Sequence, residues 1–515
     1  MSTHRSLIKS AGVIGFLTGI SRLLGFVRDL IIATAFGTSV GAEAFVVSFK
    51  IPNLLRDLVG EGAANSAFVP VLIECREKRK EEFWRLVSTL FFIMAGVLAL
   101  ISLMGVFLAP WVVKILAPGF VSSASADKFP LTVRLTRVIF PYIFLIGLSA
   151  LAMGVLNSLK EFASSALGPI LLNLSMIVAG AFFERRFGPM ALVIGVLAGG
   201  VLQLGCQFPP LLKNGFRWSE PRFKDSSVKK IGKLLLPRAF GSALYQINIF
   251  VDSILASFEK IVGPGGQSAL YYSNRLFQLP LAIFGLAMAQ AVLPTFSSQM
   301  AQNDMRAFKE TFSMTLRSLM LVVLPASAGL IVLARPIIRT LFERGRFDAH
   351  STQITSGALF FYAFGLLSCC VVKILVNAFY AVHDTKTPVK TMLVAVALNV
   401  IFSLILMKPL KIGGLALAST LSVTLNMGML YGLLKKKVGD PGERKILQSF
   451  LKMLAAAAVM GSLVALYNRF VLERVVSEPG WVRVSCLFFG ILAGILVYVA
   501  SLFALRAEEI KKVFR

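Results

Sequence analysis

The chain has 515 residues, of which 56% are hydrophobic and only 15% charged, and its mean hydropathy is +0.77. This composition excludes a soluble globular enzyme and indicates an integral membrane protein, whose organisation follows from counting apolar spans of about 20 residues. The formal net charge of +27 is largely a matter of membrane topology, and a nucleic-acid partner is the weaker explanation, because the basic residues are spread over many short loops instead of one patch.

Apolar runs bounded by charged or Gly/Pro clusters predict an all-α membrane protein with 14 transmembrane helices. In chain order they cover residues 11–36, 42–73, 86–115, 130–157, 163–183, 189–212, 231–257, 266–297, 310–342, 353–381, 388–408, 412–434, 447–468 and 481–505. Lys and Arg crowd alternate loops, notably residues 76–85, 213–230 and 435–445. The positive-inside rule therefore places these loops, and with an even number of spans both termini, in the cytoplasm.

The first predicted helix carries Arg22, Arg28 and Asp29 inside an otherwise apolar run. A charge near the bilayer centre costs about 2.5–3.5 kcal/mol, so such residues usually face a water-filled cavity. Arg28 lies about 100° around the helix from Asp29, so we expect the acid to pair with an arginine only if the helix bends at Gly25. The alternative is an internal ion pair that only locks helix packing.

The second predicted helix repeats this pattern with Lys50, Arg56 and Glu61. Residues 60–66 contain two glycines beside Glu61, which predicts a break in the helix or close packing of small residues. Because cations outnumber nearby acids among the charged residues at the corresponding positions of both halves, where Arg238 and Arg275 add to this set, we expect a cationic cavity that binds an anion. Guanidinium groups suit phosphate through bidentate hydrogen bonds.

An internal repeat relates the two halves of the chain. Residues 26–33 and 44–50 have echoes at residues 250–256 and 269–275, an offset of 224 to 225 positions that aligns Lys50 with Arg275. A repeat of six helices keeps the same membrane orientation, so the halves are parallel repeats with a substrate site between two lobes. We expect lobes at residues 1–220 and 221–440, with the two helices of residues 441–515 outside the duplication.

No constellation of residues predicts catalysis. The five cysteines have no metal-ligand spacing, and His350 has no companion ligands. The sequence also lacks a P-loop, which argues against direct use of ATP. The membrane potential or a cation gradient remains as the driving force.

Short motifs along the chain resemble the MurJ (MviN) family of bacterial lipid II flippases. They lie at residues 21–29, 49–56, 61–63, 67–70, 141–143, 171–176, 272–275, 292–294 and 384–390. The resemblance implies the exporter fold of the multidrug/oligosaccharidyl-lipid/polysaccharide superfamily, with two six-helix lobes forming a V-shaped cavity and two C-terminal helices forming a groove for a lipid tail. It also implies transport of the undecaprenyl-pyrophosphate-linked disaccharide-pentapeptide across the bacterial inner membrane for peptidoglycan synthesis and cell shape.

The resemblance also implies roles for individual residues. The substrate-binding set comprises Arg22, Arg28, Asp29, Arg56 and Arg275, to which the charge pattern and the repeat add Lys50. Glu43 is similar to a family acid after the first outer loop, and Glu43 and Glu61 are candidates for coupling or gating. Some family members bind sodium, and Asp252, Asn399 and Thr420 are similar to their ligands, although Ser403 stands where an acid is expected. No other cofactor is implied.

Three alternatives remain open at this stage. A cation-coupled drug antiporter of the same superfamily is disfavoured by the excess of arginine, since cationic drugs call for acidic residues. A flippase for another polyprenyl-linked glycan has the same cavity charge. A transport-inactive membrane scaffold or receptor is disfavoured by the intact Arg22, Arg28 and Arg275. Protein partners and oligomeric state are not indicated by the sequence.

Overall fold

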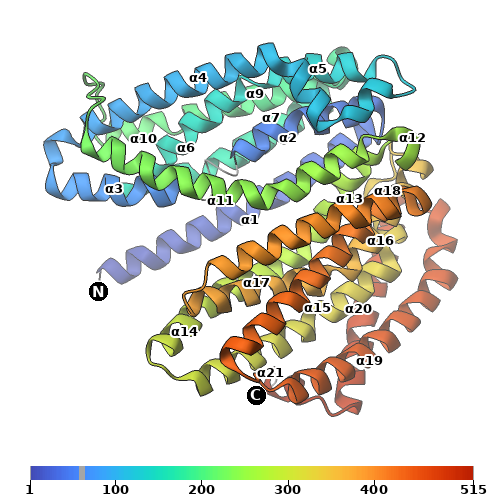
Figure 1. Ribbon diagram of the computed structural model, residues 1–515. Helices are drawn as coiled ribbons and strands as arrows, with labels where there is room; N and C mark the ends of the chain where they lie inside the picture. Colours follow the sequence, from blue (N-terminus) through green and yellow to red (C-terminus); the bar gives the residue numbers. More distant parts are fainter. Residues whose placement is uncertain (1, 57–63, 514–515) are drawn as a thin grey trace. The chain divides into compact units, whose positions relative to one another are not determined.

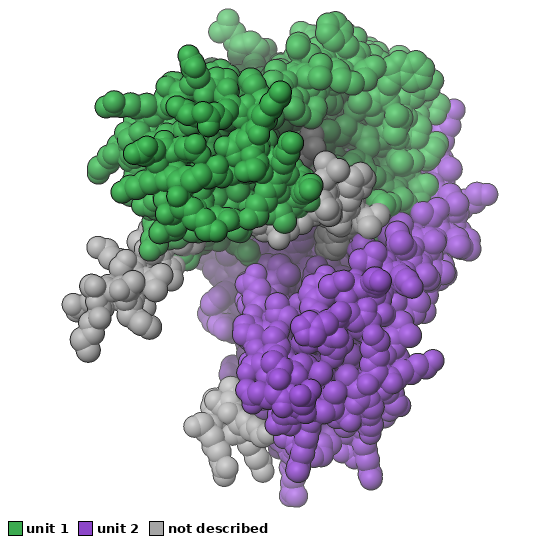
Figure 2. Space-filling model, turned by 60° about the vertical axis from the view of Figure 1, so that its left-hand side comes forward, with its two compact units in different colours: residues 1–259, 344–346 green, residues 260–343, 347–515 purple. Residues whose placement is uncertain are grey.

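The computed structural model describes residues 2–56 and 64–513, and every regular element in this part of the chain is helical (Figure 1). Its contacts group the chain into two compact units, drawn in different colours in Figure 2. Unit 1 comprises residues 1–259 and 344–346, and unit 2 comprises residues 260–343 and 347–515. The lobe boundaries expected from the sequence repeat stay a prediction.

Unit 1 is built from long helices joined by short turns. In chain order its elements are α1 (Ser2–Phe36), α2 (Val40–Arg56), α3 (Ala64–Lys78), η2 (Lys80–Glu82), α4 (Phe83–Leu116), η3 (Pro118–Ser122), α5 (Lys128–Ile139), α6 (Tyr142–Ser158), α7 (Ala163–Phe182), α8 (Glu184–Phe187), α9 (Met190–Gly205), α10 (Phe208–Lys213) and α11 (Ser226–Ala256). Helix α7 packs between α1 and α9, α2 packs on α5, and α11 packs along α3 and α4. These contacts bury one face of α1 and α2, the helices that carry the predicted site.

Unit 2 follows after the short helix α12 (Glu259–Val262), which starts at the boundary. Its elements are α13 (Gly266–Pro280), the π-helical turn η4 (Leu281–Leu286), α14 (Ala287–Ala301), α15 (Met305–Phe342), α16 (Ala349–Phe364), α17 (Leu366–Ala381), α18 (Lys386–Val438), α19 (Glu443–Tyr467), η5 (Asn468–Leu472), η6 (Arg474–Ser477), α20 (Gly480–Ala504) and α21 (Glu508–Val513). Helix α15 packs against α16 and α19, and α19 packs on α20 (Figure 1).

Within the described residues, eight helices are long and apolar enough to cross a membrane, or nine if the bent pair α16 and α17 forms one span. The chain is therefore a multi-pass membrane protein. The full count of 14 spans stays a prediction. The predicted break at residues 60–66 of the second span falls largely in the segment 57–63, which lies outside the described residues. This segment includes Glu61.

The structure contains turns and bends in or between several predicted spans, each at an identifiable residue. The predicted span 130–157 agrees with one candidate span, Lys128–Ser158, which has a turn at Pro141 between α5 and α6 because proline has no N–H to donate. The predicted span 353–381 bends by 45° at Gly365, between α16 and α17. A Cβ on Gly365 would lie 2.9 Å from Thr420 Oγ1, so the bend fits closely against α18. Inside α18 the backbone leaves helical geometry at Lys411, with φ 52°, between the predicted spans 388–408 and 412–434.

Candidate substrate-binding site

Helix α1 buries the ion pair between Arg28 and Asp29, which are only 4% and 2% exposed. Arg28 Nε and Nη2 donate to Asp29 Oδ1 at 3.0 and 2.8 Å, and Nη1 donates to Asn173 Oδ1 at 2.9 Å. The expectation that Asp29 pairs only if the helix bends was wrong. The two residues are adjacent within one α-helix, and the long arginine side chain folds back onto its neighbour's carboxylate.

Asn173 on α7 holds this pair in place. Its Nδ2 donates to the carbonyl oxygen of Ser21 at 3.0 Å while its Oδ1 accepts from Arg28, so one amide joins α7 to two turns of α1. The sequence placed Asn173 within a family motif without assigning it a role. An amide in an otherwise apolar membrane helix was the available signal, because such a group needs a hydrogen-bond partner.

The remaining predicted cations belong to both units: Arg22, Lys50 and Arg56 to unit 1, and Arg275 to unit 2. In unit 1, Arg22 is exposed and Lys50 is half-buried, whereas the side chain of Arg56, at the end of α2, lies outside the described residues. In unit 2, Arg275 is half-buried on α13. Its Nη2 donates to Tyr271 Oη at 3.4 Å, and its guanidinium lies 5.2 Å from the centre of the same ring. Tyr271, one turn before Arg275, was not singled out from the sequence.

A second buried charge network contains the predicted residue Glu43. Lys128 Nζ donates to Glu43 Oε2 at 2.5 Å and to Glu259 Oε2 at 3.3 Å, and it lies 4.5 Å from the centre of the Phe120 ring. The lysine is 1% exposed. Ser123 Oγ donates to Glu259 as well. The network joins α2, α5 and α12, so Glu43 is held by packing contacts of unit 1. The sequence places Lys128 in the loop before the predicted span 130–157, and no local pattern indicates that its side chain is buried.

The residues similar to a family sodium site are also divided between the units. Asp252 lies on α11 in unit 1, and Asn399 and Thr420 are buried on α18 in unit 2. Among the described residues, Asn399 Oδ1 and Ser403 Oγ are buried without a hydrogen-bond partner. One turn apart on a helix, they share a face. These oxygens are the donor type that hard cations select.

The segment 344–346 is an unexpected contributor to unit 1. The Arg346 backbone N–H donates to Thr34 O at 2.9 Å, and the Arg346 guanidinium pairs with Glu184 at 3.3 Å. Gly345 has φ +60°, and a Cβ there would lie 2.4 Å from the Thr34 carbonyl oxygen. Only glycine fits this approach, so the segment is fixed against the C-terminal part of α1.

The family motif at residues 384–390 has a structural explanation. Asp384 accepts hydrogen bonds from the backbone N–H groups of Lys386 and Thr387 and pairs with Lys437, so it caps α18 and ties both ends of that element together. The hydrogen bond from Lys437 is the main cause that holds the pKa of Asp384 well below its usual value.

Comparison with known proteins identifies the family. Residues 32–481 match the family described as "Lipid II flippase MurJ". The chain belongs to the MurJ family. It is 34% identical over 515 residues to the "Probable lipid II flippase MurJ" of Haemophilus influenzae, covering 96% of this chain and 99% of the relative. It is also 34% identical over 476 residues to the "Lipid II flippase MurJ" of Burkholderia cenocepacia, covering 90% of each chain.

Solved structures agree with this assignment. A structure titled "Lipid II flippase MurJ, inward closed conformation" has a TM-score of 0.80 and 25% identity to this chain, covering 98% of this chain and 99% of that one. An inward-facing multidrug resistance MATE transporter of the MOP superfamily has a TM-score of 0.70 at 14% identity, covering 82% of this chain and 96% of that one, and shows the shared fold alone. The MurJ resemblance predicted from the motifs is confirmed.

Proposed function

We propose that this chain is a lipid II flippase, a transporter and not an enzyme, that carries the pyrophosphate-linked peptidoglycan precursor from the inner to the outer leaflet of the bacterial inner membrane. Membership of the MurJ family over residues 32–481 supports the substrate, and the eight or nine apolar helices found among the described residues support the multi-pass location. Alternating access between two lobes requires no covalent chemistry.

The finer architecture is part of the proposal. Fourteen helices form two parallel six-helix lobes around a V-shaped cavity, and residues 441–515 supply a groove for the lipid tail. The repeat that aligns Lys50 with Arg275 supports the lobes. The basic loops at residues 76–85, 213–230 and 435–445 support cytoplasmic termini.

The buried Arg28 is the observation that carries the binding chemistry. Its guanidinium is held by Asp29 and Asn173, so the charge is stabilised inside the protein before any substrate arrives. A pyrophosphate oxygen accepts a charge-assisted hydrogen bond from this guanidinium, while Asp29 and Asn173 keep it oriented. Arg22, Lys50, Arg56 and Arg275 complete the anion site. Binding favours closure only through a higher affinity for the closed state.

A sodium ion is proposed as the coupling cation. Asp252, Asn399 and Thr420 would hold it, with Ser403 contributing a hydroxyl in place of an acid, and the ion would supply a positive charge that is moved or neutralised during the cycle. Each charge moved contributes about 2.3 kcal/mol per 100 mV of membrane potential. Glu43 and Glu61 are proposed for coupling or gating.

The test is transport by the purified full-length protein in liposomes containing labelled lipid II, followed through accessibility of the head group. Arg28→Ala is expected to reduce transport by about a hundredfold, the order expected when a buried charged hydrogen bond is lost. Arg134→Ala, which removes an exposed arginine of α5, is the matched control and should transport like the unchanged protein. Equal transport by both variants, or no transport under an imposed potential or sodium gradient, would contradict the proposal.

A further inference from the structure

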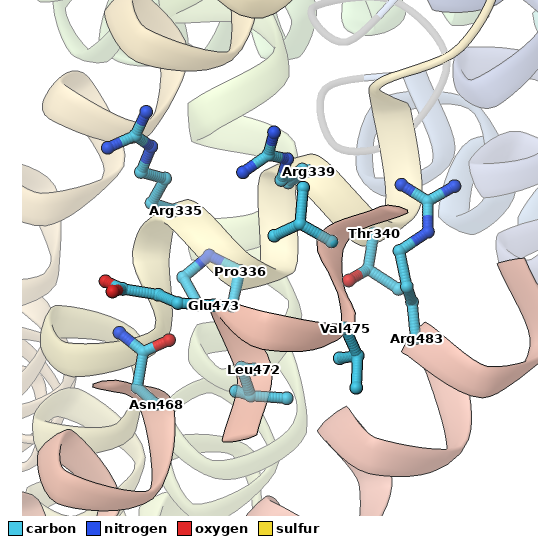
Figure 3. Close-up of a pocket in the computed structure, with 10 residues that line it drawn as sticks. Arg335, Pro336, Arg339, Thr340, Asn468, Leu472, Glu473, Val475 and Arg483 are labelled. Carbon is cyan, nitrogen blue, oxygen red and sulfur yellow. The ribbon is translucent and has the colours of Figure 1, made fainter. Parts of the chain in front are cut away.

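A cavity of about 330 Å³ lies in unit 2, at the end of α15 and beside the turn that joins α19 to α20. Its polar lining comes from three parts of the chain. Arg335 and Arg339 lie on α15, and Arg483 lies on α20. Asn468 is the first residue of η5, and Glu473 directly follows η5. Figure 3 shows the three arginine side chains extending to the same side of the view, with Glu473 on the side where Asn468 lies. Leu472, Val475 and Pro336 form apolar parts of the wall.

The cavity carries more positive than negative charge. Arg339 Nε is bound to Glu343 at 3.1 Å, which balances one arginine, and Glu473 is the acid in the lining. Among the residues that the structure describes, Arg483 Nε is buried and donates to no acceptor, and Asn468 Oδ1 is buried and accepts from no donor. A buried polar group left unpaired costs about 1–3 kcal/mol, so both atoms favour a ligand that supplies an acceptor and a donor.

Membrane topology does not explain this cluster. Helix α19 has 25 residues and is therefore about 37 Å long, enough to cross the hydrocarbon core. Its far end, where the cavity lies, is thus on the side opposite the basic residues Lys435–Lys437, where few cations are expected. The basic residues here are all arginine, since residues 330–345 and 465–485 contain no lysine. Arginine is the residue suited to bidentate binding of phosphate.

The surroundings of the cavity favour a lipid over a soluble anion. Trp481 at the start of α20 is 73% exposed, and Leu466, Phe470, Val484 and Phe488 are exposed nearby on the same two helices and their connection. An exposed tryptophan next to apolar helix faces is typical of the level of lipid headgroups. A phospholipid at this position has its phosphate within the arginine cluster and its acyl chains along α19 and α20.

We propose that this cavity is a binding site for an anionic glycerophospholipid whose headgroup carries a hydroxyl, such as phosphatidylglycerol, separate from the anion site proposed for the lipid II pyrophosphate. The phosphodiester oxygens accept from Arg483 Nε and from Arg335, and the headgroup hydroxyl donates to Asn468 Oδ1. Arg339 stays paired with Glu343 and contributes its remaining N–H groups. This site lies wholly within unit 2 and involves none of the charged residues assigned to the lipid II pyrophosphate. Its acyl chains lie along α19 and α20, the helices that also supply the proposed groove for the lipid II tail.

The test measures lipid retained by the purified full-length protein in detergent, using native mass spectrometry with added phosphatidylglycerol. The wild-type protein should bind phosphatidylglycerol about tenfold more tightly than zwitterionic phosphatidylcholine, since one charged hydrogen bond contributes on that order. The double variant Arg335→Gln/Arg483→Gln should lose this preference. Arg483→Lys, which keeps the charge but not the Nε donor, should retain only part of it.

Arg474→Gln is the matched control, because it removes an exposed arginine of the same connecting segment that does not line the cavity. It should bind phosphatidylglycerol like the wild type. Equal affinity for the two lipids in the wild type, or an unchanged preference in the double variant, would overturn the proposal. Displacement of the lipid by soluble glycerol phosphate at equal concentration would also overturn it, because the ligand would then be a soluble anion. The wild-type arms decide the question even if the double variant fails to fold.

Discussion

The strongest stability prediction concerns Lys128, which neutralises two carboxylates at once. Replacing it with methionine keeps the side-chain length but leaves Glu43, with its side chain 3% exposed, and Glu259 without their shared cation. Breaking a buried ion pair by removing one partner costs about 3–5 kcal/mol, and the loss of both contacts places Lys128→Met at the upper end. Glu43→Gln should cost less, because Lys128 keeps Glu259. Glu259→Gln should cost least, about 1–2 kcal/mol, since that carboxylate is farther away and partly exposed.

The assay is denaturant unfolding in detergent, followed by tryptophan fluorescence. Three of the four tryptophans lie in unit 1, so a Trp481→Phe background confines the signal to that unit; they are Trp84, Trp111 and Trp218. Among the three variants, the denaturant concentration at the unfolding midpoint should be highest for Glu259→Gln, lower for Glu43→Gln and lowest for Lys128→Met. The pair Glu43→Gln/Lys128→Met should cost less than the sum of its single changes, because it leaves fewer unpaired buried charges. A Lys128→Met protein as stable as Glu259→Gln, or strictly additive changes, would refute the reasoning.

Three further predictions concern other contacts. Asn173→Ala removes an acceptor of Arg28 and should weaken lipid II binding about tenfold, measured with the purified protein; unchanged affinity would show that Asn173 has no positioning role. Gly345→Ala should speed amide hydrogen exchange at residues 344–346, because the new Cβ collides with the Thr34 carbonyl; unchanged exchange would disprove the close contact. Because folding lowers the pKa of Asp384, its stabilisation is present above about pH 4 and is lost as the pH falls further, so Asp384→Asn should reduce acid sensitivity. Unfolding midpoints measured from pH 7 to pH 3 would contradict this if the variant and wild-type curves run parallel.

Much of the helical framework could be predicted from the sequence because hydropathy and helix breakers are local properties. The predicted spans 388–408 and 412–434 lie on either side of Lys411, where the backbone of α18 leaves helical geometry. Breaks inside predicted spans were missed where an interior residue interrupts an apolar run. Pro141 carries a local signal, whereas the bend at Gly365 depends on how closely α18 approaches.

The family was also within reach of the sequence, and so were the residues proposed for the substrate site, since Arg28, Asp29 and Arg275 are charges in apolar runs and lie in ordered motifs. Their partners were not. Asn173 lies 145 positions from Arg28, and Lys128 lies 85 positions from Glu43. No periodicity connects residues so far apart, because such contacts depend on which helices pack together and on the rotamers that their side chains adopt.

The sequence by itself thus determined the membrane class, most helix positions and the family of this protein, and it predicted a site for a phosphate-bearing substrate. Only the tertiary structure showed that Arg28 is already paired, that Lys128 is shared by two carboxylates, and that Arg335 and Arg483 line one cavity. The difference is physical. Placing a charge in an apolar run is a property of the chain, whereas compensating that charge is a property of the packed helices.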